Sequence, residues 1–373
     1  MVRMAIIGTG NMGGKYARMI WEGRIPDMCL AGVTIRRKEE QEDFCRLTDN
    51  QVKVYGSEDE LYQHADSFDA VLIATPHKLH PAMAVRAIEH GKHLLVEKPI
   101  GISLGQCRPM LEKAAASSLV FSVMFHQRAY EKFRRIKELL DGGTIGRIYR
   151  AQMENSRYFR TVRYHHSGSW RSSWTGEGGG ALINQGQHIL DIWQWLLGRP
   201  LSVSARIHFG KYNDFLVDDE ASLYMEYPNQ SCGVFILTTG EGTWTERLEI
   251  AGSKGTILLD KDTLTLYQYS QDLDEYRSQA LVHSREELQE TVSVWELPVK
   301  QEPYEMMLEN FAAAIERGEP LLVRGEEAAG ALELMNAAYL SAWKGKEISL
   351  PVDPDEYETE LEKHQREEEK DRI

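Results

Sequence analysis

The sequence predicts an α/β protein of two domains, in which a parallel sheet is followed by a large, mostly antiparallel one. Three observations predict this order. The chain has 373 residues, more than a single core usually organises. Residues 1–125 alternate strand-length apolar runs with helical patterns. Residues 201–299 read instead as successive strands with short connections, which favour antiparallel pairing.

The first region contains five apolar runs of strand length, rich in Val, Ile and Leu. They are MAII (4–7), LAGVTI (30–35), AVLIA (70–74), HLLVE (93–97) and LVFSVMF (119–125). Between them, segments such as AMAVRAIEHG (82–91) have apolar residues at helical spacing and a glycine where a helix should end. Continuously apolar strands that alternate with helices indicate a parallel sheet covered on both faces.

The second region extends over residues 126–350. It begins with a predicted helix (132–141), a loop rich in aromatic residues and arginines, and a glycine-led helix that starts after GGG (178–180). Predicted strands fill 201–299, and helices close the region at 303–345. From residue 353 onward there are ten acidic and four basic residues, so we expect residues 351–373 to form a solvated, frayed acidic tail.

Composition excludes several functional classes. A net charge of −14 argues against a nucleic-acid partner, which needs a basic patch. No apolar run is long enough to cross a membrane, and the first residues enter a strand without room for a signal peptide. The four cysteines lack metal-like spacing, which suits a cytoplasmic protein without a metal site.

GTGNMG (8–13) fits the G-x-G-x-x-G pattern between a predicted strand and a predicted helix. Gly8 would permit the tight turn, Gly10 would let a pyrophosphate approach the backbone, and Gly13 would let the helix pack closely on the strand. The alternative is a plain glycine turn. In this context the motif favours a Rossmann domain that binds a dinucleotide through Gly8, Thr9, Gly10, Asn11, Met12 and Gly13.

The end of the second strand bears on which nicotinamide cofactor binds. An NAD site usually has an acidic residue there for the ribose 2′-hydroxyl. Here GVTIRRKEE has Arg36 and Arg37 at the strand end and no carboxylate before Glu39. A guanidinium can grip a 2′-phosphate with paired hydrogen bonds, so the sequence favours NADP, with NAD possible. The alternative is two solvated arginines on a surface loop.

Further along the chain, ATPHKLHPAMAVRAIEHGKHLLVEKP (74–99) resembles the Gfo/Idh/MocA family of sugar and inositol oxidoreductases. The resemblance continues through GTIGRIYRAQ (143–152), the stretch 178–198 and the stretch 319–351. It implies a Rossmann domain followed by an α/β domain with a large open sheet. It also implies that helices 303–345 pack back toward the first domain. A homodimer or homotetramer would form through the open sheet face.

Carried over residue by residue, the resemblance implies that Thr75, Pro76, His80 and Glu97 belong to the cofactor site. It also implies that Lys98 lies between nicotinamide and substrate, where its ammonium can hydrogen-bond a reacting hydroxyl and lower its pKa. A surface lysine at a strand end is the alternative for Lys98, but the flanking Glu and Pro argue against it.

GGGALINQGQH (178–188) sets Asn184 and His188 four residues apart, on one face of a helix that Asp191 continues. In the family that this stretch resembles, the helix supplies a catalytic Asp and His. Here Asn184 stands at the usual Asp position; it cannot take a proton but can hydrogen-bond a sugar hydroxyl. His188 would accept the hydroxyl proton. Asp191 would orient His188 or cap a neighbour, and a histidine satisfied inside a core is the alternative for His188.

The preceding loop, RYFRTVRYHHSGSWRSSWTGEGGG (157–180), combines aromatic rings with arginines and hydroxyls. Such a loop suits a sugar or polyol pocket, and it equally suits a contact between subunits. The substrate-binding candidates here are Tyr164, Trp170, Arg171 and Trp174, with Arg128 and Tyr130 as weaker candidates.

The leading hypothesis is an NAD(P)-dependent dehydrogenase, with NADP favoured, acting on a secondary hydroxyl of a sugar, sugar derivative or inositol. One alternative is a glycosidase or lyase that retains its cofactor and oxidises its substrate transiently. A second is a non-catalytic sensor of dinucleotide. The presence of both Lys98 and His188 weighs against the sensor.

Overall fold

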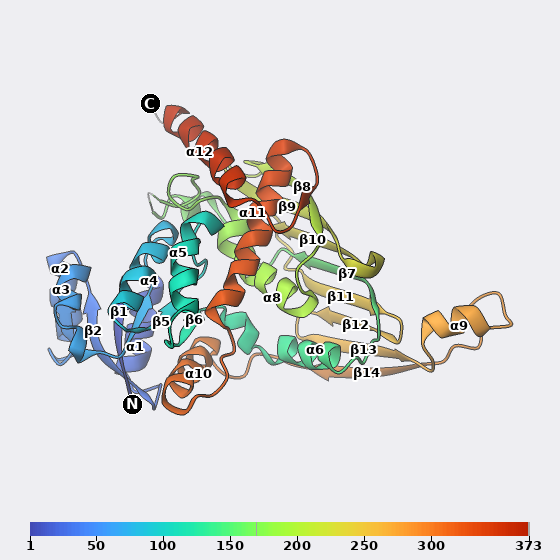
Figure 1. The fold of residues 1–373 in the computed structure, drawn as a ribbon, viewed down its shortest axis with the longest axis horizontal. Helices are drawn as coiled ribbons and strands as arrows, with labels where there is room; N and C mark the ends of the chain where they lie inside the picture. Colours follow the sequence, from blue (N-terminus) through green and yellow to red (C-terminus); the bar gives the residue numbers. More distant parts are fainter. Residues whose placement is uncertain (169, 372–373) are drawn as a thin grey trace. The chain divides into compact units, whose positions relative to one another are not determined.

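The computed structural model describes residues 1–168 and 170–371. The chain forms two compact units (Figure 1). Unit 1 contains Met1–Ala129 and Gln301–Leu332, and unit 2 contains Tyr130–Lys300 and Glu333–Ile373. Each unit has its own sheet.

Unit 1 is built on a six-stranded parallel sheet in the order β3-β2-β1-β4-β5-β6. This is the strand order of a Rossmann fold, so the predicted fold class of the first domain is confirmed. The strands are β1 (Val2–Ile7), β2 (Met28–Thr34), β3 (Lys53–Tyr55), β4 (Ala70–Ile73), β5 (His93–Val96) and β6 (Phe121–Val123). The helices are α1 (Asn11–Trp21), α2 (Lys38–Leu47), α3 (Glu58–Tyr62), α4 (His80–Glu89), α5 (Leu104–Ala115) and α10 (Pro303–Arg317).

The central parts of the strands of unit 1 are apolar because helices cover both faces of the sheet. All four residues of β4 are fully buried, and so are Met4, Ala5 and Ile6 of β1. Helix α10 comes from the distant segment 301–332. Its Tyr304 contacts Tyr16 of α1 and His126, with ring centroids 5.7 and 4.3 Å apart.

Unit 2 contains a nine-stranded sheet in the order β14-β13-β12-β11-β7-β10-β9-β8-β15. The strands are β7 (Ile148–Asn155), β8 (Ser202–Phe209), β9 (Asp218–Glu226), β10 (Cys232–Thr238), β11 (Glu246–Gly252), β12 (Gly255–Asp260), β13 (Thr263–Tyr269), β14 (Glu290–Glu296) and β15 (Ile348–Ser349). The strand order has two ends, β14 and β15, so the sheet is open. Adjacent strands pair antiparallel except β7 and β10, which pair in parallel. The predicted large, mostly antiparallel open sheet is therefore confirmed.

One face of this sheet is buried and the other is not. Across the register, Leu223, Phe235, Met153, Leu248, Leu259 and Leu264 form a buried row, each 4% exposed or less. Trp193 of α8 contacts Phe235 edge-on at 6.0 Å, so α8 covers this face (Figure 1). The helices are α6 (Glu131–Asp141), α7 (Val162–His165), a π-helical turn (Leu182–Gly186), α8 (Gln187–Leu197), α9 (Leu273–Gln279), α11 (Ala328–Lys344) and α12 (Pro354–Asp371).

The C-terminal segment differs from the frayed tail that its charge predicted. It forms α12, whose Tyr357 and Leu361 are buried, and Tyr357 stacks on Trp343 with ring centroids 5.6 Å apart. The physical reason is a stripe of Tyr357, Leu361, His364 and Glu368 at helical spacing on an otherwise charged helix. The net charge of the segment gives no indication of this stripe.

Among the described residues, no helix is both long and apolar enough to cross a membrane.

Candidate functional site

In the glycine turn between β1 and α1, two of the three motif glycines are required sterically by the protein itself and the third is not. Gly8 has a φ of +91°, and a Cβ there would lie 2.7 Å from the Ala74 carbonyl oxygen. A Cβ on Gly13 would lie 1.8 Å from the Gly8 carbonyl oxygen, because α1 packs directly on the turn. A Cβ on Gly10 would meet no atom within 4 Å. The open side of the turn is therefore at Gly10.

The start of α1 is suited to an anion. Gly10 is its N-cap residue and provides no side-chain cap for the amide groups of the first turn. Uncapped N–H groups and the helix dipole attract phosphate oxygens, and Gly10 lets such a group approach the backbone. These residues therefore fit the pyrophosphate of a dinucleotide. Thr9 and Met12 are half-buried and Asn11 is exposed at the same turn.

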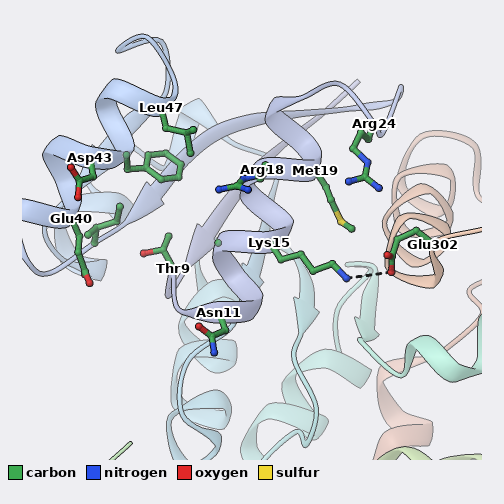
Figure 2. A pocket seen from close by; sticks show the side chains of 13 residues that line it. Thr9, Asn11, Lys15, Arg18, Met19, Arg24, Glu40, Asp43, Leu47 and Glu302 are labelled. Carbon is green, nitrogen blue, oxygen red and sulfur yellow. Dashed lines mark hydrogen bonds and ion pairs between the residues drawn. The ribbon is translucent and has the colours of Figure 1, made fainter. Parts of the chain in front are cut away.

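A hollow of about 750 Å³ lies beside this turn, between α1 and α2 (Figure 2). In Figure 2, Arg18 and Thr9 lie on its α2 side, and Lys15 extends the other way to Glu302, with Nζ and Oε1 3.3 Å apart. The hollow is lined by Thr9, Asn11, Gly14, Lys15, Arg18, Met19, Arg24, Ile35, Glu40, Asp43, Phe44, Leu47 and Glu302.

Arg36 and Arg37 are both exposed just after β2, next to the lining residue Ile35. Ile35, which stands where an NAD site usually has an acid, is 3% exposed. The Arg37 guanidinium pairs with Glu40, which also lines the hollow. The Arg37 guanidinium is therefore held beside a lining residue of the hollow by an exposed ion pair, and Arg36 directly follows another lining residue in the chain.

His80 does not have the position that the resemblance implied. The ring is fully buried, and its Nδ1 and Nε2 each lie 2.7 Å from a backbone carbonyl oxygen, of Pro99 and Thr75 respectively. Burial lowers the pKa of this imidazole. His80 is thus a strut that joins two loops and cannot itself contact a cofactor, whereas Thr75 and Pro76 stay half-buried at the end of β4.

Glu97, which the resemblance placed at the cofactor site, has a supporting role through its side chain. Its buried carboxylate accepts a hydrogen bond from the Tyr16 hydroxyl of α1 and another, 3.0 Å long, from the Lys98 amide. Burial raises the pKa of this carboxyl. Glu97 therefore holds in position the turn that carries Lys98, whose own side chain is half-buried.

In unit 2, the glycines before the predicted catalytic helix allow it to start against β9. Gly178 and Gly179 have φ angles of +83° and +146°, and a Cβ on Gly180 would lie 2.0 Å from the Asp218 carbonyl oxygen. The Asp218 carboxylate accepts hydrogen bonds from the amides of Gly180 and Leu182, at 2.8 and 2.7 Å. The three glycines thus let a buried carboxylate cap the helix.

The helix begins with a π turn, Leu182–Gly186, where the sequence predicted a regular α-helix. Asn184 lies in this turn, and α8 continues with His188 and Asp191, which are 8% and 1% exposed. An i→i+5 turn widens the helix locally, and such turns occur frequently at functional sites.

Asn184 belongs to a hydrogen-bonded cluster with Tyr164, Arg171, Glu177 and Gln185. The Tyr164 hydroxyl lies 3.1 Å from Asn184 Nδ2, 3.0 Å from Gln185 Nε2 and 3.0 Å from the Arg171 guanidinium. Asn184 Nδ2 also donates to Glu177, and Arg171 lies 3.7 Å from that carboxylate. The loop and the helix thus bring together groups that suit the donors and acceptors of a polyhydroxylated ligand.

Glu177 was missed in the sequence. It is 2% exposed, and its carboxylate also accepts a 2.7 Å hydrogen bond from the Ser172 amide. The signal available in the sequence was an acidic residue flanked by glycines in TGEGGG, which neither a helix nor a solvated surface explains.

The two tryptophans of the loop differ. Trp170 is half-buried, with the Arg171 guanidinium 4.7 Å from its ring centroid. Trp174 is 2% exposed; its ring contacts Tyr339 at 5.2 Å and Trp343 at 5.3 Å, and its Nε1 donates to the Leu216 carbonyl. The prediction that Trp174 contacts substrate is therefore corrected, because this side chain belongs to the core.

The two weaker candidates, Arg128 and Tyr130, are 2% and 8% exposed, and Arg128 pairs with Glu327. Of the predicted catalytic residues, Lys98 belongs to unit 1, and Asn184 and His188 belong to unit 2.

Comparison with known families identifies both regions. Residues 2–125 match the family model described as "Oxidoreductase family, NAD-binding Rossmann fold". Residues 137–350 match its partner model, "Oxidoreductase family, C-terminal alpha/beta domain". Together the two matches include nearly all of both predicted domains.

Two relatives from Bacillus subtilis differ in their cofactor. A scyllo-inositol 2-dehydrogenase (NADP⁺) is 27% identical over 261 residues, covering 70% of this chain and 76% of its own. A scyllo-inositol 2-dehydrogenase (NAD⁺) is 27% identical over 265 residues, covering 69% and 73%. A dehydrogenase from Chromobacterium violaceum, solved with NADH and UDP-GlcNAcA, shares the fold, with a TM-score of 0.79. It is 22% identical, and the alignment covers 94% of this chain and 96% of that one.

Proposed function

The chain belongs to the Gfo/Idh/MocA oxidoreductase family, and on that premise we propose that it is an NADP-preferring dehydrogenase of a sugar, sugar derivative or inositol. Hydride would pass between nicotinamide and a secondary hydroxyl carbon of the substrate. The inositol dehydrogenases among its relatives support this substrate class. The observation that carries the proposal is the cluster around Asn184, in a chain whose Rossmann turn is open at Gly10.

The preference for NADP rests on this chain's own residues, because the two inositol dehydrogenases use different cofactors. A 2′-phosphate needs cations at the end of β2, and Arg36 and Arg37 supply two. The Arg37–Glu40 ion pair is exposed, so exchanging Glu40 for a phosphate would cost little. Ile35 offers no carboxylate that would repel the phosphate.

The proton of the reacting hydroxyl would be managed by two groups. The Lys98 ammonium would hydrogen-bond the hydroxyl oxygen and lower its pKa, and the His188 imidazole would accept the proton. Asn184 cannot take a proton, so its role would be to hold the substrate by hydrogen bonds. Its amide nitrogen donates to both Tyr164 and Glu177, which fixes the orientation of the amide.

The remaining polar groups of the cluster would bind the substrate's other oxygens. Tyr164 contacts Asn184 directly, Arg171 contacts Tyr164, and the Arg171 guanidinium lies over the Trp170 ring. Aromatic faces suit the C–H surfaces of a sugar ring, and guanidinium and hydroxyl groups suit its oxygens.

We further propose a cytoplasmic homodimer or homotetramer that associates through the open sheet face. The cysteines are unbonded, which suits a reducing compartment. According to the strand register, the face opposite to the buried row contains Tyr224, Val234, Leu258 and Val294. Of these, Tyr224 and Val294 are 44% and 58% exposed, and with Gln152, Glu249 and Thr265 of the same row they form a mixed polar and apolar surface that a second copy would cover.

The test starts with nucleotide-stripped protein, titrated with NADPH and with NADH while tryptophan fluorescence is followed. The oxidised cofactors are then mixed with a panel of sugars and inositols, and formation of reduced cofactor is measured. We expect tighter binding of NADPH and turnover of one class of polyol.

Two variants test the 2′-phosphate site. Arg36→Ala and Arg37→Ala should each weaken NADPH binding about tenfold or more and leave NADH binding within twofold, because each removes one charge-assisted contact. Arg46→Ala, which removes an exposed arginine later in α2, is the matched control. Equal binding of NADPH and NADH would refute the NADP preference. Cofactor that co-purifies, with product but no net reduction, would indicate the cofactor-retaining alternative. Binding without any turnover would indicate the sensor.

A further inference from the structure

The last helix of the chain is bonded to the loop that carries the Asn184 cluster. The Glu368 carboxylate of α12 accepts hydrogen bonds from the amides of Trp174 and Thr175, at 3.0 and 2.9 Å. It accepts a third, at 2.7 Å, from the Thr175 hydroxyl. Gln365, one turn earlier in α12, donates a 3.0 Å hydrogen bond to the Trp174 carbonyl. Four hydrogen bonds thus join α12 to two consecutive loop residues.

Glu368 stands out from its acidic neighbours. It is 4% exposed, whereas Glu367 and Glu369 on either side are exposed. Burying a carboxylate is costly unless several donors satisfy it, and here three donors converge on it. The inward orientation of this one acid in REEEK therefore reflects a specific contact with the loop.

The loop residues that α12 holds are close in sequence to the cluster. Thr175 precedes Glu177 by two residues, and Glu177 is the carboxylate that bonds Asn184. The amides of Glu177 and Gly178 donate to the Ser173 carbonyl, at 3.1 and 2.9 Å, so the segment 173–178 is one tight turn. A displacement of Trp174 or Thr175 would therefore move Glu177.

One side of this contact, α12, lies beyond the residues that match the family models. The matched C-terminal domain ends at residue 350, and α12 begins at Pro354. We propose that Glu368 and Gln365 are positioning residues of the substrate site, through which the C-terminal helix sets the location of Glu177 against Asn184. They touch the loop and not the substrate. The effect on substrate rests on the proposed function, and the effect on the loop does not.

The test uses the full-length protein with Glu368→Gln. This variant keeps the size of the side chain but removes its charge and one of its two acceptor oxygens. Glu367→Gln is the matched control, because it makes the same change one residue away on an exposed side chain. Gln365→Ala removes the other contact and serves as a second variant.

The first readout is amide hydrogen exchange, resolved by residue. In Glu368→Gln we expect exchange at Trp174 and Thr175 to accelerate about tenfold, as for the loss of one charge-assisted hydrogen bond. The acceleration should extend through residues 176–180, and Glu367→Gln should match the unchanged protein. If exchange is unchanged, or accelerates only at 174–175, the positioning role is overturned.

The second readout separates positioning from general stability. With the best polyol substrate, Glu368→Gln and Gln365→Ala should raise KM several-fold while kcat and the Kd for NADPH stay within twofold. A fall in kcat with KM unchanged, or an equal loss of NADPH affinity, would overturn the proposal. If no polyol is turned over, the proposed function fails, and the exchange pattern still decides whether α12 positions the loop.

Discussion

Replacing Gly13 by alanine should lower the stability of the fold, whereas replacing Gly10 should weaken NADPH binding, although both are glycines of one motif. A Cβ at Gly13 would lie 1.8 Å from the Gly8 carbonyl oxygen, so α1 would have to move by at least about 1.2 Å to restore a 3.0 Å contact. Both sides of this contact are backbone, and neither can rotate away. Overpacking of this kind costs about 3 kcal/mol at the upper end of the usual range.

Unit 1 has about 160 residues, and at this size 3 kcal/mol corresponds to a fall in Tm of about 6–12 °C. Gly10→Ala should leave Tm nearly unchanged, because the added methyl meets nothing within 4 Å and the φ of −63° suits alanine. That methyl would instead occupy the side from which a pyrophosphate approaches, so the affinity for NADPH should fall about tenfold or more.

The assay is a thermal melt of each variant, with a fluorescence titration of NADPH on each. Gly14→Ala is the matched control within α1, since its Cβ would lie at an ordinary 3.4 Å from the nearest atom, the Thr9 carbonyl oxygen. It should melt at or slightly above the original temperature, and only its melt serves as the control because Gly14 also lines the hollow. An unchanged Tm for Gly13→Ala, or unchanged NADPH binding by Gly10→Ala, would refute this reasoning.

Two further predictions concern the core of unit 2. Trp174→Ala should lower the free energy of unfolding, measured in urea, by about 3–5 kcal/mol, because the indole is packed in the core. Trp170→Ala should lower it much less. Equal losses for the two variants would contradict the core assignment of Trp174. Asp218→Asn should cost about 1.5–3 kcal/mol, because one helix-start amide loses its charged acceptor. Burial raises the pKa of Asp218, so the folded protein keeps a proton that the unfolded chain has released. Because of this carboxyl, the free energy of unfolding falls as pH rises from about 3.8 through the raised pKa. Above that pKa, the contribution of Asp218 no longer depends on pH. Urea unfolding between pH 4 and 7 should show a smaller fall for Asp218→Asn, and an identical slope would contradict the assignment.

The strands and their pairing could be predicted from sequence only where pairing is local. Apolar runs marked the strands of both sheets, and the strands that follow one another closely pair antiparallel as expected. The parallel pair β7–β10 was not predicted, because the two strands are separated by α8, β8 and β9. Pairing at that distance depends on the tertiary fold, and no local pattern encodes it.

In the candidate site, too, features that depend on local sequence could be predicted, and features that depend on contacts between distant segments could not. The tight turn at Gly8 and the close packing at Gly13 could be predicted, because both follow from backbone geometry close in sequence, whereas the role of Gly10 toward a pyrophosphate stays a prediction. Trp170 and Trp174 could not be told apart, since composition says nothing about which ring turns inward. Glu177 and Glu368 were missed because charge counts treat every acid as solvated, whereas these two are held by donors from other segments.

The discontinuity of unit 1 has a consequence for synthesis on the ribosome. Residues 1–129 leave the ribosome first, but α10 and the segment up to Leu332 are translated only after about 170 residues of unit 2. Until then Tyr16 and His126 lack the Tyr304 ring, and the Ser122 hydroxyl lacks the Val323 carbonyl that accepts its 2.8 Å hydrogen bond. The nascent Rossmann sheet therefore remains incompletely covered while the first segment of unit 2, Tyr130–Lys300, is synthesised. A fragment cut at residue 125 would keep that unfinished surface permanently, so cofactor-binding work on the isolated first domain should append residues 301–332 through a linker.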